Sequence, residues 1–150
     1  MARQKNALRG HFIAPVTDPK TEPDKAAYKE LAKWIEDVDD DTDEATTSVA
    51  YYDGDGTEET TVTSVKGSYT FKGTYDKEDE AMALIAGLKY KLGNDRLVWH
   101  KVVDSDGKNQ HVGIATVSVI KAGSGAAANY EEFSCKISYN SLPKTTAVVG

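Results

Sequence analysis

The chain has 150 residues, of which 39% are hydrophobic and 28% are charged, and it contains one cysteine. This length is that of one ordinary domain with its own hydrophobic core, and the composition excludes a disordered chain. A single cysteine excludes an internal disulfide bond. Cys135 occupies an apolar position of FSCKISY and is predicted to be a buried, reduced thiol.

Neither membrane insertion nor export is indicated by the sequence. The longest nearly apolar run, residues 81 to 88, is far shorter than the roughly 20 residues that span a bilayer. The N-terminal apolar patch is short and is interrupted by Pro15, unlike that of a signal peptide. We therefore expect synthesis and residence in a cytoplasm, with no membrane partner.

Negative charge is concentrated in one stretch of the chain. Residues 34 to 65 contain eleven of the 24 acidic residues and no lysine or arginine. The rest of the chain therefore has all 18 basic residues against 13 acidic ones, although the net charge of the whole is -6. Opposite charges on one subunit favour head-to-tail association. A simpler interpretation is a solvated acidic loop.

The first third of the chain shows little regular pattern. Residues 1 to 23, with Pro15 and Pro23, show neither helical nor strand periodicity and are predicted to form an extended arm. The segment DKAAYKELAK, residues 24 to 33, follows a proline and is predicted to form a short helix. The segment WIEDVDD is predicted to continue as a strand.

Residues 42 to 60 are predicted to form a long acidic loop, since they have no periodicity of their own. A loop of this length within a compact domain indicates either a function or disorder. Its tip, YYDGDG, contains two glycines that permit positive φ and aspartates that can bond their own backbone. The tip is therefore predicted to contain at least one tight turn.

The clearest strand signal follows in YTFKGTY. Aromatic and polar residues alternate there, which predicts a half-buried strand with Tyr69, Phe71 and Tyr75 on one face and Thr70, Lys72 and Thr74 on the other. A helix is predicted over residues 77 to 92. It would begin after a cap at Asp76, bury Met82, Ile85 and Leu88 on one side, and end at Gly93.

Three further strands are predicted over residues 96 to 103, 111 to 122 and 130 to 140. DSDGKNQ is typical of a hairpin turn between the first two, and GSGAAAN is typical of a flexible loop between the last two. In the last strand, alternation places four residues on one face: Phe133, Cys135, Ile137 and Tyr139. Residues 140 to 150 are predicted to form a second arm.

The acidic stretch does not have the spacing of an EF-hand. Such a loop needs glycine at its sixth position and glutamate at its twelfth, and loops that begin at Asp37 or at Asp53 have neither. A looser divalent-ion site at Asp53 and Asp55 stays open, because a DGD turn can present carboxylates and carbonyls to a hard cation.

Other patterns that carry chemistry are missing from the sequence. No phosphate-binding loop occurs, and His11, His100 and His111 are far apart in sequence and lack the paired spacing of metal ligands. Each histidine is predicted to be a surface or strand residue. No serine lies in a nucleophile elbow, and carboxylates on a mobile loop give no geometry for acid–base catalysis. We expect no enzymatic activity and no cofactor, and the acidic field disfavours tight DNA binding.

Two blocks of the sequence resemble a known family. They are YDGDGTEETTVTSVKGSYTFKGTYDKEDEAMALIAG and VGIATVSVIKAGSGAAANYEEFSCKISYN, and the resemblance extends over about residues 34 to 139. The family is that of the major tail proteins, or tail tube proteins, of long-tailed non-contractile bacteriophages (siphophages), particularly those that infect Gram-positive hosts. The most specific pieces are YDGDG, the strand that leads through TYDKEDEA into a helix, and ATVSVIKAGSG. Both arms resemble the family less clearly.

The resemblance implies a fold that is mainly β with one flanking α-helix (α+β), namely a β-sandwich whose strands join a ring-wide β-barrel in the oligomer. Six copies would form a ring, and rings would stack head to tail around a tape-measure protein into a conduit for DNA ejection, with the long loop and the arms bridging rings. Further partners would be the tail terminator and distal tail proteins. The protein would reside in the virion tail after assembly in the host cytoplasm.

Charge and resemblance together predict an assembly surface on the acidic loop. Its candidate residues are Asp39, Asp40, Asp41, Asp43, Glu44, Tyr51, Tyr52, Asp53, Asp55 and Glu58. Two alternatives stay open: a calcium-dependent β-sandwich binding module, and a terminator, neck or secretion-tube protein that stops at one ring.

Overall fold

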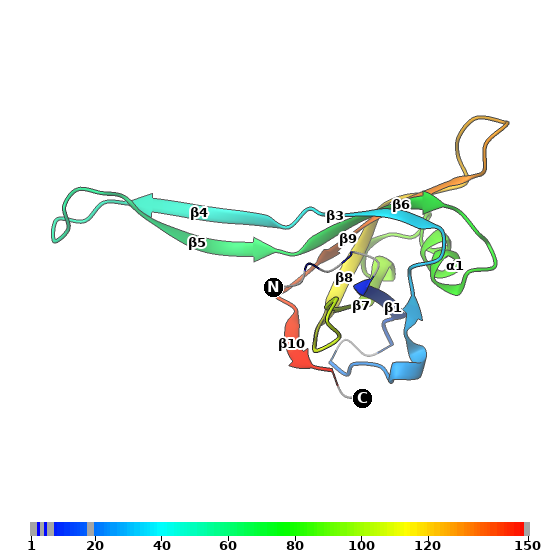
Figure 1. Ribbon diagram of the computed structural model, residues 1–150, viewed down its shortest axis with the longest axis horizontal. Coiled ribbons are helices and arrows are strands. Elements are labelled where there is room, and N and C mark those ends of the chain that lie inside the picture. Colours follow the sequence, from blue (N-terminus) through cyan, green and yellow to red (C-terminus); the bar gives the residue numbers. More distant parts are fainter. Residues whose placement is uncertain (1–2, 4, 6–7, 18–19, 149–150) are drawn as a thin grey trace.

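The computed structural model describes residue 3, residue 5 and residues 8–17 and 20–148. These residues form a curled β-sheet with one α-helix, and a long hairpin projects from the sheet (Figure 1). The strands are β1 (Gly10–Pro15), β2 (Lys29–Glu30), β3 (Ile35–Asp40), β4 (Asp43–Val49), β5 (Glu59–Lys66), β6 (Ser68–Thr74), β7 (Leu97–Val103), β8 (Asn109–Ala122), β9 (Glu132–Tyr139) and β10 (Lys144–Ala147). The helix is α1 (Glu80–Gly87), and short 3-10 helices cover Lys25–Ala27 and Gly93–Arg96.

Eight strands form the sheet in the order β2-β1-β7-β8-β9-β6-β3, with β10 paired to β8, and β4 pairs only with β5. The sheet curls until its two halves face each other. The His11 ring on β1 lies 5.0 Å from the ring centroids of both Tyr69 and Phe71 on β6, although three strands separate β1 from β6 in the sheet. The predicted fold, mainly β with one helix, is thereby confirmed, and one curled sheet supplies both facing layers.

The core lies inside the curl and against α1. The predicted alternation in β9 is confirmed, because Phe133, Cys135, Ile137 and Tyr139 are all buried. Met82, Ile85 and Leu88 of the helical segment are buried against the same cluster, as predicted. Each large apolar side chain that becomes buried contributes roughly 1.5 to 3 kcal/mol. Burial also raises the pKa of the Cys135 thiol to about 12, which keeps it protonated.

The N-terminal segment forms part of the sheet, contrary to the predicted arm. β1 pairs with β7 along its whole length, and both of its faces are covered. His11 and Ile13 are buried inside the curl, whereas Ala14 packs with Trp99 in a second cluster on the other face. A strand that is buried on both faces shows no polar alternation, which explains the missing signal. The predicted C-terminal arm likewise contains β10, which pairs with β8.

The helix predicted over residues 24 to 33 is not formed. A 3-10 turn and the short strand β2 occupy that segment. Tyr28 belongs to the outer cluster and Leu31 to the inner core. A helix would place these two residues on one side. An extended chain places them on opposite faces of the sheet, as the two clusters require.

The predicted acidic loop is a β-hairpin. β4 and β5 pair in antiparallel register, with Thr46 opposite Val62 and an irregularity between Ala45 and Thr46. Threonine and valine favour strands, but both faces of this hairpin are exposed, so apolar alternation is absent. The predicted tight turn at the tip is confirmed, since the Gly54 N–H donates to the Tyr51 carbonyl over 3.1 Å.

The helix is shorter than predicted and starts later. Asp79 is its N-cap, and its carboxylate accepts the Met82 N–H over 3.2 Å. Asp76, the predicted cap, instead accepts the Glu78 N–H in a turn that precedes the helix. The helix ends at Gly87, not at Gly93. No helix among the described residues is long and apolar enough to cross a membrane.

Candidate assembly surface

The β4–β5 hairpin projects far from the curled sheet (Figure 1). The chain passes from β3 into β4 and returns from β5 into β6, so one long ribbon connects the body to the tip. The ribbon is anchored at its joint with the body, the place where it leaves the sheet, because the Asp41 N–H donates to the Ser68 carbonyl over 2.8 Å. Every residue from 39 to 66 is exposed. The hairpin is therefore available for contact along its whole length.

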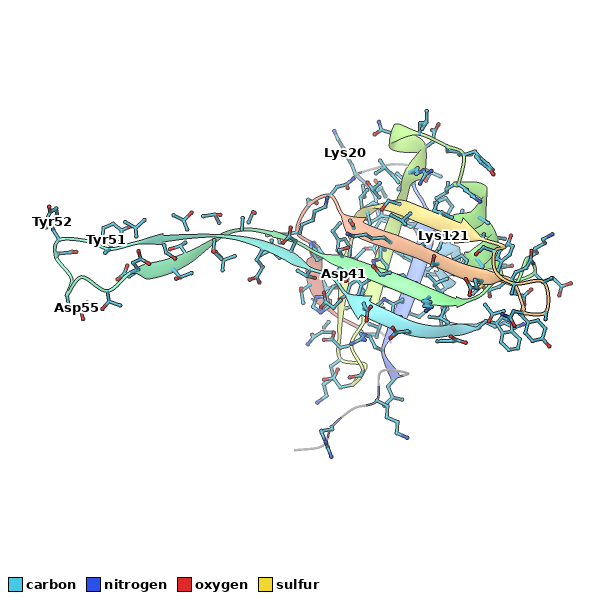
Figure 2. All side chains as sticks on the ribbon, turned by 90° about the horizontal axis from the view of Figure 1, so that it is seen from above. Lys20, Asp41, Tyr51, Tyr52, Asp55 and Lys121 are labelled. Carbon is cyan, nitrogen blue, oxygen red and sulfur yellow. The ribbon has the colours of Figure 1, made fainter. Side chains whose placement is uncertain are left out.

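The ten predicted site residues fall into two separate groups on this ribbon. One group lies at the joint with the body: Asp39, Asp40, Asp41, Asp43 and Glu44. The other group lies at the tip: Tyr51, Tyr52, Asp53, Asp55 and Glu58. Figure 2 shows Asp41 beside the body and Tyr51, Tyr52 and Asp55 at the far end of the hairpin. The structure thus places the predicted residues at the two ends of the hairpin.

The middle of the hairpin carries no charge. Its strands contribute ATTSV, residues 45 to 49, and TTVTSV, residues 60 to 65. The Ser48 and Thr60 hydroxyls bond each other across the hairpin over 3.0 Å, and Val62 remains 49% exposed. A two-stranded hairpin is marginally stable by itself, and an uncharged edge is prone to pair with another chain. This neutral middle is a second candidate contact zone that the sequence reasoning missed.

The tip carries two tyrosines that pack on nothing in the chain's core. Tyr52 is fully exposed, and Tyr51 is about half exposed. Tyrosine is enriched among the residues that dominate binding at protein interfaces. Asp55 accepts the Thr57 N–H over 2.9 Å, and hydrogen bonds from the side chain and the backbone of Thr57 lower the pKa of Asp55. The tip therefore presents aromatic rings and ionised carboxylates on a defined turn.

No group of three or more potential metal ligands occurs among the described histidine, cysteine, aspartate and glutamate residues. Calcium takes six to eight oxygen ligands. Asp53 and Asp55 would supply two side chains to such a site, and the carboxylate of Asp55 already closes the turn.

Two of the histidines meet in the core, which the sequence reasoning also missed. His11 Nδ1 lies 3.4 Å from His100 Nε2, and the two rings stack. Burial, with the charge of Arg9, lowers the pKa of His11 to about 4, and burial beside His11 lowers that of His100 to about 3. Both are neutral at pH 7. The runs HFIAP and LVWHKVV put both histidines in the inward phase of strands, which was the available signal.

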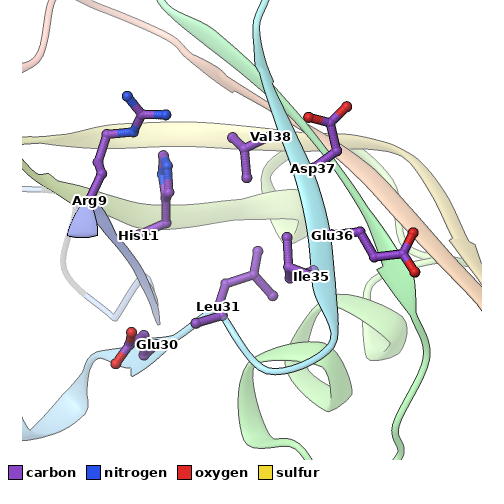
Figure 3. Close-up of a pocket in the computed structure, with 9 residues that line it drawn as sticks. Arg9, His11, Glu30, Leu31, Ile35, Glu36, Asp37 and Val38 are labelled. Carbon is purple, nitrogen blue, oxygen red and sulfur yellow. The ribbon is translucent and has the colours of Figure 1, made fainter. Parts of the chain in front are cut away.

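A cavity of about 250 Å³ opens beside this pair, at the seam between β1 and β3 (Figure 3). Arg9 and His11 stand on one side of it, and Ile35 and Val38 stand on the other. His11 Nε2 has no hydrogen-bond partner in the structure. An ordered water can satisfy such an atom in a polar cavity of this size. His111 lies elsewhere, against Asp104 and Thr145, so the three histidines form no common site.

Comparison with known proteins shows the fold but no family. No protein-family model matches the sequence, and no curated protein matches it. A chain from the tail of an empty gene transfer agent particle, solved with C6 symmetry, superposes with a TM-score of 0.69 at 12% identity, over 97% of this chain and 100% of that one. A chain from the virion of the native gene transfer agent gives 0.70 at 10% identity, with the same coverage.

A third similar structure comes from the tube-terminating cap of the anti-feeding prophage. It has a TM-score of 0.54 at 8% identity and covers 99% of this chain and 93% of that one. Identities this low establish the fold and nothing finer. Over 97% of its length, the chain superposes on the tail tube fold that is present in the tail of a gene transfer agent.

Proposed function

We propose that this protein is the structural subunit of a tail tube in a phage-like particle. Copies associate into rings, and rings stack head to tail into a hollow tube. The observation that carries this proposal is the superposition with the gene transfer agent tail chain, which covers 97% of one chain and all of the other. The exposed hairpin supports it, because such a hairpin gains stability only from a partner.

Finer features of the proposal rest on the sequence resemblance. The whole chain, residues 1–150, acts as one tail tube domain without enzymatic activity, and six copies form each ring. The particle is a siphophage of the type that infects Gram-positive hosts. The tube surrounds a tape-measure protein, contacts the tail terminator and distal tail proteins, and conducts DNA during ejection. It is assembled in the host cytoplasm and resides in the virion tail.

In this proposal the hairpin bridges neighbouring rings. Its two acidic groups, at the joint and at the tip, meet the net-basic remainder of the next copy. Such a contact joins different surfaces on the two partners, and this geometry extends into a filament when it does not close on itself. The acids therefore orient the copies, whereas the neutral middle supplies area that association can bury.

Electron microscopy of the purified protein at high concentration tests the proposal. We expect hollow tubes of uniform width. A variant with the four joint acids Asp39, Asp40, Asp41 and Asp43 changed to lysine should form no tubes, while its monomer melts cooperatively by circular dichroism. Wild-type protein that stays monomeric under every solution condition would refute the proposal, and intact tubes from the variant would refute the role of the joint acids.

A terminator that stops at one ring is the second candidate. The similarity to the tube-terminating cap of the anti-feeding prophage favours it. The distribution of particle lengths separates the two functions. A tube subunit gives particles of many lengths, whereas a terminator gives single rings at all protein concentrations.

A further inference from the structure

Trp34 is an exposed tryptophan in an unusual backbone conformation. Its φ is 66°, in the left-handed region that bulky residues rarely adopt, and its side chain is 56% exposed. Such a conformation costs free energy and persists only where the surroundings enforce it, and it is concentrated at functional sites. Trp34 immediately precedes β3, at the end of that strand which is remote from the hairpin.

Contacts from three directions hold Trp34 in place. Its carbonyl accepts the Thr74 N–H over 2.9 Å, and a Cβ at position 73 would overlap this carbonyl, so the close approach requires Gly73. Its indole N–H donates to the Asp76 carboxylate over 3.0 Å. Lys33 bonds the same carboxylate over 3.6 Å and lies 5.7 Å from the centre of the indole ring. The ring is therefore fixed in position while most of it faces solvent.

Fixed, exposed aromatic rings are suited to binding. An interface side chain that is already ordered loses little conformational entropy when a partner covers it. Tryptophan and tyrosine are the residues most enriched among those that dominate binding energy. Trp34 is therefore suited to receive a partner. It lies within the folded chain, directly before β3, and not in an unstructured terminus.

The ribbon that carries Trp34 also carries the tip tyrosines at its other end. From Trp34 the chain runs through β3 and β4 to the tip, and it returns through β5 and β6 to Asp76. Figure 1 shows the start of β3 and the tip of the hairpin on opposite sides of the molecule along its longest axis. When copies repeat head to tail along this axis, the tip of one copy approaches the Trp34 end of the next.

We propose that Trp34 and Lys33 form the docking site for the hairpin tip of a second copy of this chain. The inference rests on the proposed tube. The tip supplies Tyr51 and Tyr52 to pack on the indole, and its carboxylates approach the ammonium group of Lys33. The tip has three acids and no base. Lys33 contacts the indole ring and also pairs with Asp76, so an acid of the tip would share this ammonium group with Asp76.

Fluorescence quenching tests this docking with the native side chains. The chain has two tryptophans, and the second, Trp99, is 9% exposed. In a Trp99→Phe variant, all tryptophan emission comes from Trp34. We expect acrylamide to quench it strongly in the monomer and weakly in assembled tubes, with a blue shift of the emission on assembly. Equal quenching in monomers and in tubes would overturn the inference and leave the proposed function intact.

Cross-linking identifies the occupant. A Trp34→Cys, Tyr52→Cys double variant should give a ladder of covalent oligomers under mild oxidation, because Cys135 is buried and does not compete. The matched control is Tyr90→Cys with Tyr52→Cys, since Tyr90 is an exposed aromatic residue outside the ribbon. Tubes without a ladder, or an equal ladder from the control, would overturn the inference alone. Wild-type protein that never assembles would refute the proposed function and this docking with it.

Discussion

The curled sheet and the β4–β5 hairpin are both built from antiparallel strands, but they differ in what their side chains contact. In the sheet, every strand of the core buries at least one face, and residues such as Phe71 and Phe133 are completely buried. In the hairpin no side chain is buried, because both faces of both strands are exposed. The sheet can therefore stabilise itself, whereas the hairpin must find its stability in another molecule.

This difference separates folding from assembly within one chain. Changes inside the curled sheet should alter the free energy of unfolding and should affect assembly only through the loss of the fold. Changes on the hairpin should leave the monomer unaltered and act on assembly directly. The following predictions test that separation, in decreasing order of their effect on the free energy of unfolding.

Truncation of a core aromatic residue should have the largest effect. Phe133→Ala removes a ring that is fully buried and stacks on Tyr75, and we expect it to lower the free energy of unfolding by about 3 to 5 kcal/mol. Urea unfolding of the monomer, followed by circular dichroism, measures this. Tyr52→Ala is the matched control, because its ring is exposed and its loss should leave the midpoint unchanged. Equal midpoints for the two variants would contradict the separation.

Acid should destabilise the curled sheet through its histidine pair. The pKa of His11 is lowered to about 4 and that of His100 to about 3, from an ordinary value of 6.5. Below pH 6.5 the unfolded chain therefore binds protons that the folded chain does not bind. The free energy of unfolding is highest above pH 6.5 and falls as the pH drops toward 4. The loss should amount to roughly 3 kcal/mol or more over this range.

The pH dependence of urea midpoints measures this loss. A His11→Phe, His100→Phe variant is the control, because it should lose the slope between pH 6.5 and 4 whatever its absolute stability. A slope that persists in the variant would assign the acid sensitivity to carboxylates. Asp76, which is partly buried, and Asp55, which is exposed, also have lowered pKa values, and therefore titrate at lower pH.

The sequence predicted strands that alternate between core and solvent, and also β7, an apolar run that is buried on both faces, but it missed β1 and the hairpin. β9 and β6 alternate between core and solvent, so their pattern was readable. β1 is covered on both faces and the hairpin is exposed on both, and neither pattern alternates. The segment from 24 to 33 failed because its apolar residues serve two different clusters, which is a property of the fold and not of a local period.

The candidate site was predictable in composition but not in space. Counting charges located the acidic stretch, yet only the strand pairing showed that its acids lie at two ends of a neutral hairpin. Trp34 had no local signal, because its conformation depends on Gly73 and Asp76, about forty residues later in the chain. The same holds for the histidine pair, whose members are brought together by the pairing of β1 with β7.

A charge in the neutral middle of the hairpin should have a small effect on folding and a large one on assembly. Val62→Lys changes a side chain that is about half exposed, so the free energy of unfolding should shift by no more than about 0.5 kcal/mol. Tubes should nevertheless be lost, since a buried lysine without a partner opposes association. Leu92→Lys is the control, because Leu92 is an exposed apolar residue outside the hairpin. Tubes from Val62→Lys seen by electron microscopy would restrict the contact zone to the acidic ends.

Calcium should have the smallest effect. A binding module saturated with calcium at a hundred times its dissociation constant would gain about 2.7 kcal/mol of stability. At the tip, however, Asp53 and Asp55 would supply two carboxylates, of which Asp55 already accepts from Thr57, and this is too little for a cation that takes six or more oxygens. We expect the melting temperature to be the same in calcium and in EDTA. A higher melting temperature in calcium, lost in an Asp53→Asn, Asp55→Asn double variant, would instead identify the hairpin tip as an ion site. The tip tyrosines would then lie beside a bound ion.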